Sequence, residues 1–128
     1  MPSTPTENAR DAVSVGVDGI IVSNHGGRQL DAAPSSIDSL RALPDSIFAD
    51  TTVLIDSGVR TGLDVVRAKA LGAQAAFTGR SFFYGMGALG LKGASQVIEI
   101  FRDEITRSLQ QVGCTRFDEM DASWLADQ

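Results

Sequence analysis

Three short apolar runs, separated by longer stretches with helical periodicity, set the pattern of this chain. The runs predict buried strands over residues 19–23, 52–56 and 75–78. Each run is followed by small, polar or charged residues and then by a segment that favours a helix. Such alternation is typical of successive β/α units with parallel strands, so the pattern predicts an α/β fold.

Capping residues and helix breakers mark the ends of the expected helices. The stretch Thr4–Glu7 has the pattern of a capping box, and Thr61 with Asp64 indicates a second cap. Pro44 is expected to end a short helix that precedes the second strand. The expected helices cover residues 5–15, 36–43, 61–71, 81–86 and 94–112, and residues 24–34 are expected to form a loop.

The longest expected helix is amphipathic and is followed by a polar tail. Gly113 is expected to end this helix. One stripe of the helix carries its apolar residues, which are Val97, Ile98, Phe101, Ile105 and Leu109. The tail offers four apolar anchors, which are Phe117, Met120, Trp124 and Leu125.

Composition narrows the class of protein. The 128 residues suffice for one domain with a core, and 43% of them are hydrophobic. A net charge of −5 without a basic stripe argues against nucleic acid as a partner. The single cysteine, Cys114, excludes an internal disulfide and a cysteine-based zinc site, and no metal is expected. The sequence shows no signal peptide, membrane span or C-terminal peroxisomal tripeptide, so a cytoplasmic location is expected.

The stretch Ser23–Asp31 carries the most specific candidate chemistry. It directly follows the first strand and contains the only histidine, His25, three residues before Arg28. Imidazole is a base near neutral pH, and a guanidinium can hold a carboxylate at two points. Each residue alone is more often structural or solvated. Their shared place at the carboxyl end of a strand favours an active-site loop for a small carboxylic acid.

Two further loops have a pattern that suits anion binding. The stretches Asp56–Arg60 and Gly79–Arg80 each follow an apolar strand and precede a helix. Small residues expose backbone N–H groups, a helix N-terminus attracts negative charge, and an arginine adds a fork of donors. The two loops together predict a phosphate cradle, although ordinary turn chemistry explains the glycines of any α/β fold equally well.

These motifs resemble those of the FMN-dependent α-hydroxy-acid dehydrogenases and oxidases, the family of glycolate oxidase, L-lactate dehydrogenase and mandelate dehydrogenase. The resemblance rests on Ser23–Asp31, on Asp56–Arg60 with Ser57 in place of a usual glycine, and on Gly79–Ser81. It implies the C-terminal portion of a (β/α)8 TIM barrel, with about three β/α units and a C-terminal helix. It also implies FMN as cofactor and oxidation of a small 2-hydroxy acid to the 2-keto acid.

The resemblance also implies roles for individual residues. His25 is the expected catalytic base, and with Arg28, which holds the substrate carboxylate, it forms the substrate site. The expected FMN contacts are Ser23, Asp56, Ser57, Gly58, Val59, Arg60, Gly79 and Arg80.

The length of the chain departs from that family. A complete barrel takes roughly 250 residues, so residues 1–128 are expected to form a partial FMN-dependent hydroxy-acid dehydrogenase domain. Open strand edges invite association with a second copy or a complementing chain. One alternative is a noncatalytic half-barrel that associates with another chain and binds little flavin. A different phosphate-binding barrel is a second alternative, which the pairing of His25 with Arg28 disfavours.

Overall fold

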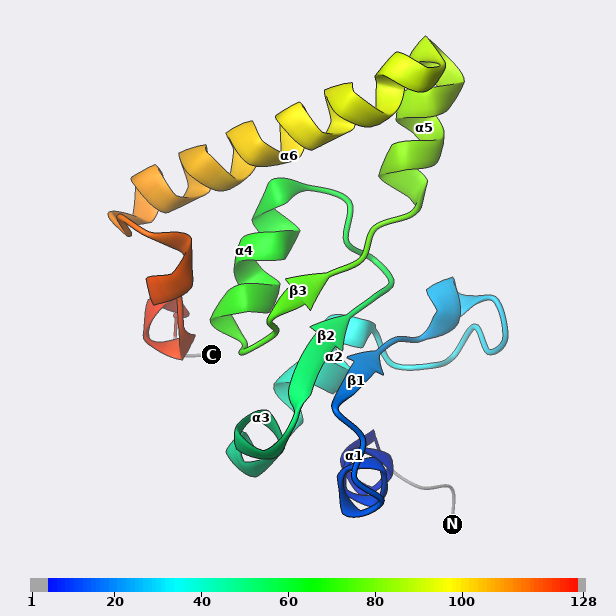
Figure 1. Ribbon diagram of the computed structural model, residues 1–128, viewed down its shortest axis with the longest axis vertical. Helices are drawn as coiled ribbons and strands as arrows, with labels where there is room; N and C mark the ends of the chain where they lie inside the picture. Colours follow the sequence, from blue (N-terminus) through cyan, green and yellow to red (C-terminus); the bar gives the residue numbers. More distant parts are fainter. Residues whose placement is uncertain (1–4, 127–128) are drawn as a thin grey trace.

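The computed structural model describes residues 5–126 and has a three-stranded sheet at its centre. The strands β1 (Gly19–Val22), β2 (Thr52–Ile55) and β3 (Ala75–Ala76) follow one another across the sheet (Figure 1). Both pairings are parallel, and the two residues of β3 lie opposite Leu54 and Ile55. The predicted α/β fold with parallel strands is therefore confirmed.

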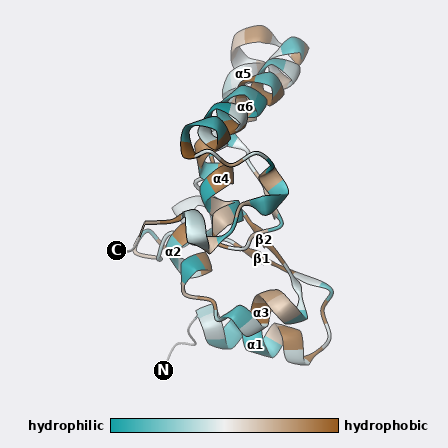
Figure 2. Cartoon of the chain, turned by 90° about the vertical axis from the view of Figure 1, so that its left-hand side faces the viewer, coloured by the Kyte–Doolittle hydropathy of each residue, from teal (hydrophilic) through white to brown (hydrophobic). Residues whose placement is uncertain are grey.

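Helices connect and flank the strands. The pair α5 and α6 lies at one end of the molecule and the pair α1 and α3 at the other, with β1 and β2 between them (Figures 1 and 2). The helices are α1 (Pro5–Ser14), α2 (Ser36–Arg41), α3 (Asp45–Asp50), α4 (Gly62–Ala70), α5 (Arg80–Leu89) and α6 (Leu91–Val112), with 3-10 turns η1 (His25–Gly27), η2 (Phe117–Glu119) and η3 (Ala122–Trp124).

One face of the sheet is packed and the other is open. Val53 and Ile55 of β2 are almost fully buried in a core that includes Leu40 of α2 and Ile47 of α3. A second buried cluster joins α4 to the tail through Val66, Ala70, Cys114 and Met120. On β1, Ile21 is 54% exposed. The packed face fixes the strands, whose carboxyl ends carry the candidate site.

The helices near Pro44 and Gly90 differ from those expected from the sequence. The helix α2 ends at Arg41, two residues earlier than expected, and Pro44 stands at the N-cap of α3, a helix that the sequence did not predict. That helix forms because Ile47 is buried and Phe48 packs against the core. The helices α5 and α6 are longer than expected because Gly90, with a φ of 60°, is the break between them, whereas Gly93 lies within α6.

Smaller differences concern β3, the stripe on α6 and the tail. The third strand has two residues rather than the four expected. Ile98 was placed on the buried stripe but is 48% exposed. Of the four tail anchors, Met120 is buried, whereas Trp124 and Leu125 are exposed. The expected cap at Thr4 lies outside the described residues. Within residues 5–126, no helix is long and apolar enough to cross a membrane.

Candidate functional site

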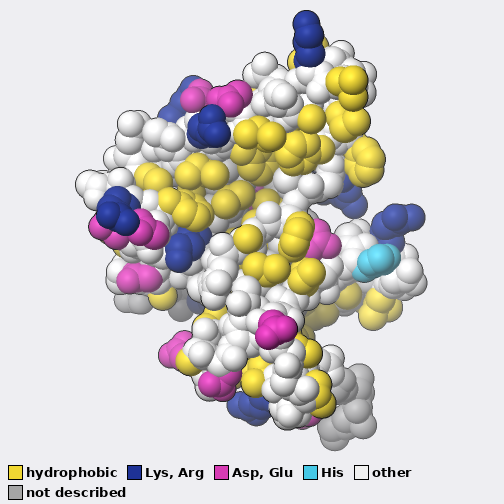
Figure 3. Space-filling view, in the orientation of Figure 1, with side chains coloured by type: hydrophobic (Ala, Val, Ile, Leu, Met, Phe, Trp, Pro, Cys, Tyr) yellow, Lys and Arg dark blue, Asp and Glu magenta, His cyan; other side chains and the backbone are white. Residues whose placement is uncertain are grey.

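A hollow of about 460 Å³ lies at the carboxyl ends of the three parallel strands. Loops from all three strand ends line it, together with two phenylalanines. Figure 3 shows the single histidine at the rim of the molecule, beside a Lys or Arg side chain. The lining residues are Asn24, His25, Gly26, Gly27, Arg28, Asp56, Ser57, Gly58, Val59, Arg60, Phe77, Thr78, Gly79, Arg80 and Phe83.

The histidine sits on a tight left-handed turn that follows β1. His25, Gly26 and Gly27 have φ values of 56°, 67° and 71°. Two glycines adopt this conformation without strain, but a histidine rarely does. The turn places His25 and Arg28 on the same rim of the hollow, as the sequence predicted.

Hydroxyl and amide side chains hold this turn. The backbone N–H of His25 donates to Ser23 Oγ at 3.0 Å. The N–H of Gly26 is shared between Asn24 Oδ1 at 3.1 Å and Ser57 Oγ at 3.0 Å. Ser23 Oγ also donates to Asp56 Oδ2 at 3.0 Å. The end of β1 is thereby joined to the end of β2 through side chains that the sequence analysis placed at the cofactor.

Three arginines give the hollow its positive charge. Arg28, Arg60 and Arg80 are exposed, and no ion pair within residues 5–126 involves any of them. A guanidinium nitrogen of Arg80 lies 3.4 Å from the carbonyl oxygen of Gly26. A hollow lined by three arginines without acidic partners suits an anionic ligand.

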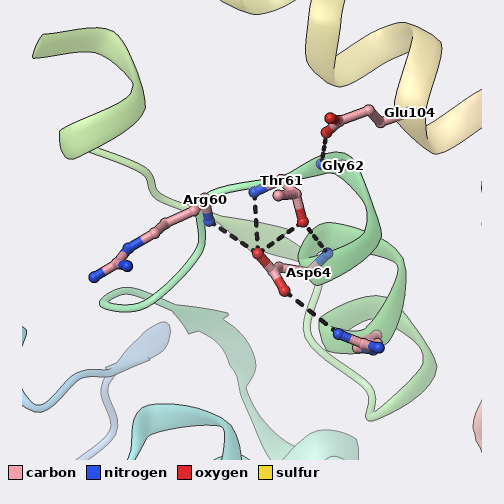
Figure 4. A network of polar contacts seen from close by, with 6 residues as sticks. Arg60, Thr61, Gly62, Asp64 and Glu104 are labelled. Atoms are coloured by element: carbon pink, nitrogen blue, oxygen red, sulfur yellow. Dashed lines mark hydrogen bonds and ion pairs between the residues drawn. The ribbon is translucent and has the colours of Figure 1, made fainter. Parts of the chain in front are cut away.

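The start of α4 is closed by the chain's own side chains (Figure 4). The Asp64 carboxylate accepts the N–H of Arg60 at 3.1 Å, the N–H of Thr61 at 3.0 Å and the Thr61 hydroxyl at 2.8 Å. Glu104 of α6 accepts the N–H of Gly62 at 2.6 Å. The predicted cap at Thr61 and Asp64 is confirmed as a capping box, and it leaves the side chain of Arg60 pointing away from it (Figure 4).

The start of α5 differs because its N-cap residue, Gly79, makes no side-chain capping hydrogen bond. The neighbouring hydroxyls bind the preceding loop instead. Thr78 Oγ1 donates to the carbonyl of Val59 at 2.7 Å, and Ser81 Oγ donates to the carbonyl of Arg60 at 3.0 Å. The β2–α4 and β3–α5 loops are thus held side by side, with an uncapped helix start facing the hollow.

Most of the predicted site residues line one hollow. Ser23 is the exception, because it lies beneath the turn and lines a neighbouring groove between α1 and β1. The side chain of Val59 is buried in the core, so only its backbone faces the site. No role in the site was predicted for Asn24, Phe77, Thr78, Ser81 or Phe83, although Asn24 and Ser81 lie within the motifs that carry the family resemblance. The one signal in the sequence that could have identified them is that they lie close to Gly26–Arg28 or Gly79–Arg80.

Comparison with known proteins gives one family. Residues 4–127 match the profile of the family described as FMN-dependent dehydrogenase. The chain is 47% identical over 119 residues to an L-lactate dehydrogenase of Pseudomonas syringae pv. syringae (strain B728a), covering 93% of this chain and 31% of that protein. It is 52% identical over 99 residues to an L-lactate dehydrogenase of Actinobacillus pleuropneumoniae serotype 5b (strain L20), covering 77% and 26%.

Solved structures agree with the sequence comparison. The monotopic membrane protein (S)-mandelate dehydrogenase superposes with a TM-score of 0.86 at 41% identity, covering 96% of this chain and 32% of that one. A mutant flavocytochrome b2 with pyruvate bound gives 0.89 at 37% identity, covering 94% and 32%. The chain therefore spans about a third of the length of these relatives, and its three parallel strands match part of their TIM barrels.

Proposed function

This chain belongs to the family of FMN-dependent dehydrogenases, and we propose that it provides the base, the carboxylate-binding arginine and the phosphate cradle of a 2-hydroxy-acid oxidising site. In such a reaction the 2-hydroxy acid loses two electrons and two protons and becomes the 2-keto acid. The observation that carries the proposal is that one hollow, at the carboxyl ends of three parallel strands, is lined by His25, Arg28, Arg60 and Arg80.

The residues present fit the phosphate end of FMN. The uncapped start of α5 offers backbone N–H groups beside the guanidinium of Arg80, and Arg60 approaches from the adjacent loop. A Cβ built on Gly58 would have no atom within 4 Å, so the backbone there is open to a ligand. We therefore assign the phosphate to Gly79, Arg80 and Arg60, with the Asp56–Gly58 loop beside the rest of the cofactor.

The substrate end has a base and a fork of donors. Arg28 is suited to hold the carboxylate of a 2-hydroxy acid at two points and so to fix the direction of its α-carbon. His25, as a neutral imidazole, is suited to accept a proton from the substrate and to become an imidazolium ion. FMN, when bound, supplies the acceptor for the two electrons. The named relatives make L-lactate the first substrate to test.

A hybrid enzyme tests this proposal. In it, residues 4–127 replace the matching segment of the Pseudomonas syringae L-lactate dehydrogenase, and flavin reduction by L-lactate is followed in an anaerobic stopped-flow instrument. We expect His25→Ala to keep FMN bound but to slow reduction by about 10²- to 10⁴-fold at saturating substrate. We expect Arg28→Lys to raise the L-lactate concentration that is needed, because lysine keeps the charge but loses the planar grip. Reduction of the His25→Ala flavin at the parent rate would place the base elsewhere.

A second candidate function is a noncatalytic half-barrel that associates with a second copy or a complementing chain. It is favoured by the open face of the sheet, where Ile21 is 54% exposed, and by Phe77 directly after β3, which is 50% exposed. We expect the chain by itself to bind FMN weakly, because it spans about a third of its relatives and carries only part of the cofactor site. Fluorescence titration measures the dissociation constant of FMN. A hybrid enzyme that binds FMN but whose flavin is not reduced by L-lactate would support the half-barrel function. Tight, stoichiometric quenching of FMN fluorescence by the chain alone would contradict that function.

A further inference from the structure

We infer that Ser57 is a positioning residue whose hydroxyl fastens the histidine-bearing turn to the end of β2. The inference deepens the proposed function and rests on it, because the turn is important for catalysis only if His25 is the base. It concerns a serine that the sequence analysis assigned to the flavin site.

The backbone of Ser57 is in an unfavourable conformation. Its φ is 78°, and within residues 5–126 His25 is the only other non-glycine residue with a positive φ. Glycine adopts this conformation without strain, whereas a side chain with a Cβ does not. A serine at this position therefore introduces strain, and what it adds is one hydroxyl group.

That hydroxyl makes hydrogen bonds within the protein both to other side chains and to the backbone of the turn. Each serine hydroxyl has one proton and two acceptor lone pairs. Ser23 Oγ donates to Asp56 Oδ2 at 3.0 Å, and the proton of Ser57 has two acceptors within reach, Ser23 Oγ at 3.1 Å and Asp56 Oδ2 at 3.5 Å. Ser57 Oγ also accepts the N–H of Gly26 at 3.0 Å. The result is a hydrogen-bond network that joins the Gly26 N–H, the hydroxyls of Ser57 and Ser23 and the Asp56 carboxylate.

The chain of bonds connects two strand ends at the turn itself. Two successive N–H groups, those of His25 and Gly26, end on the hydroxyls of Ser23 and Ser57. Asn24 shares the Gly26 N–H, but it lies two residues away on the same loop and cannot tie the turn to another strand. Ser57 gives the turn a direct bond to the loop that follows β2. The Ser57 hydroxyl therefore helps to set the position of His25 relative to the phosphate cradle, together with the Ser23–Asp56 bond and the contact of Arg80 with the Gly26 carbonyl.

Two substitutions at one position separate the hydroxyl from the strain. Ser57→Ala removes the hydroxyl and keeps the Cβ, whereas Ser57→Gly removes both. Ser14→Ala is the control, because the Ser14 hydroxyl bonds only the carbonyl of Asp11 at the end of α1. Hydrogen exchange of the Gly26 amide is measured by NMR on the full chain. Both Ser57 variants should exchange about two- to tenfold faster than the parent, as the loss of one hydrogen bond predicts.

The outcomes decide between a tether and the alternatives. Unchanged exchange of the Gly26 amide in both Ser57 variants overturns the inference. Faster exchange in Ser57→Ala alone also overturns it, because only that variant keeps the strained Cβ and the strain would then explain the change. Since Ser57→Gly relieves strain, it should fold even if Ser57→Ala does not. This measurement needs no flavin, so it stands even if the hybrid enzyme shows the proposed function to be wrong.

The hybrid enzyme distinguishes a positioning role from direct contact with the cofactor. A tether predicts that Ser57→Gly slows flavin reduction at saturating L-lactate about tenfold while the dissociation constant of FMN changes less than about twofold. A direct contact predicts the reverse, a weaker hold on FMN with an unchanged rate at saturating flavin. The second pattern would overturn the inference and return Ser57 to the set of cofactor contacts.

Discussion

The starts of α4 and α5 look alike in sequence but differ in structure. Both helices follow a parallel strand and a loop with glycine and arginine, so from sequence alone each is equally suited to bind a phosphate. In the structure, Asp64 and Glu104 occupy the start of α4, whereas Gly79 leaves the start of α5 without a side-chain cap. The comparison teaches that a helix N-terminus is an anion site only where the chain's own carboxylates do not already fill it.

The two starts also have different neighbours. Gly62 is buried against α6, and a Cβ built there would lie 2.6 to 2.7 Å from atoms of Phe101, Glu104 and Ile105. A Cβ built on Gly79 would meet only the ring of Phe83, at 4.0 Å. One helix start therefore belongs to the packing of the molecule and the other to the hollow.

The largest expected effect breaks the packed start. We expect Gly62→Ala to lower the free energy of unfolding by about 3 kcal/mol, because two of the three close atoms belong to the backbone of α6 and cannot move aside. Gly79→Ala, the matched change at the open start, should cost less than about 1 kcal/mol. Urea denaturation followed by circular dichroism measures both. Equal losses would mean that the two starts are equally packed.

The next effect concerns the ligand side of the comparison. In the hybrid enzyme, Arg80→Ala should raise the dissociation constant of FMN about tenfold to a hundredfold, as the loss of a charge-assisted bond predicts. Arg67→Ala is the matched control, because Arg67 pairs with Asp64 at the closed start, 3.7 Å apart. Its effect on FMN should stay below about twofold. Flavin fluorescence titration measures both constants, and unchanged affinity in Arg80→Ala would remove Arg80 from the cradle.

A smaller effect tests the cap on α4. Glu104→Ala leaves the buried N–H of Gly62 without its acceptor, so we expect a loss of about 1–2 kcal/mol in the free energy of unfolding. Glu99→Ala on the same helix removes only an exposed pair with Arg102 and should cost less than about 0.5 kcal/mol. If the two glutamate variants unfold at the same urea concentration, the cap contributes no more than a surface ion pair.

Elements marked by local sequence signals were predicted, whereas contacts between distant residues were not. The apolar runs, the Thr61–Asp64 cap and the stop at Gly113 are local signals, and the structure confirms the elements that they predict. Glu104 lies 42 residues from the N–H that it caps, so no local pattern identified it. The short helix expected before Pro44 is present but ends at Arg41, and the helix that follows Pro44 depends on burial of Ile47, which is a tertiary effect.

The candidate site likewise has features that short motifs predict and one contact between distant residues that they do not. Short motifs were sufficient to predict that His25, Arg28, Arg60 and Arg80 line one hollow, because parallel strands bring their carboxyl ends to one edge. The motifs could not predict that the Ser57 hydroxyl bonds Gly26 across 31 residues. The roles of these side chains toward FMN and substrate stay predictions, which the hybrid enzyme can test.

The smallest expected effect concerns Asp118, a carboxylate that pairs with an arginine at the surface, in contrast to Glu104, which caps a buried backbone N–H. In the tail, hydrogen bonds from the Arg116 guanidinium lower the pKa of Asp118 below its ordinary value of 3.8. A carboxyl whose pKa is lower in the folded state stabilises the fold above its ordinary pKa. That stabilisation is lost as the pH falls through the lowered value. Arg116→Ala should therefore raise the pKa of Asp118 toward 3.8, as measured by carboxyl ¹³C NMR titration.

Both side chains of this pair are about two-thirds exposed, so water screens their attraction. We therefore expect Arg116→Ala to change the thermal midpoint at pH 7 less than Glu104→Ala does. Repeating the melts of the parent and Arg116→Ala at a pH below the lowered pKa of Asp118 is the control, since protonation of Asp118 should then remove the contribution of this pair. A larger loss at pH 7 for Arg116→Ala than for Glu104→Ala would contradict the ranking, because the tail pair would then hold the molecule more firmly than the cap on α4.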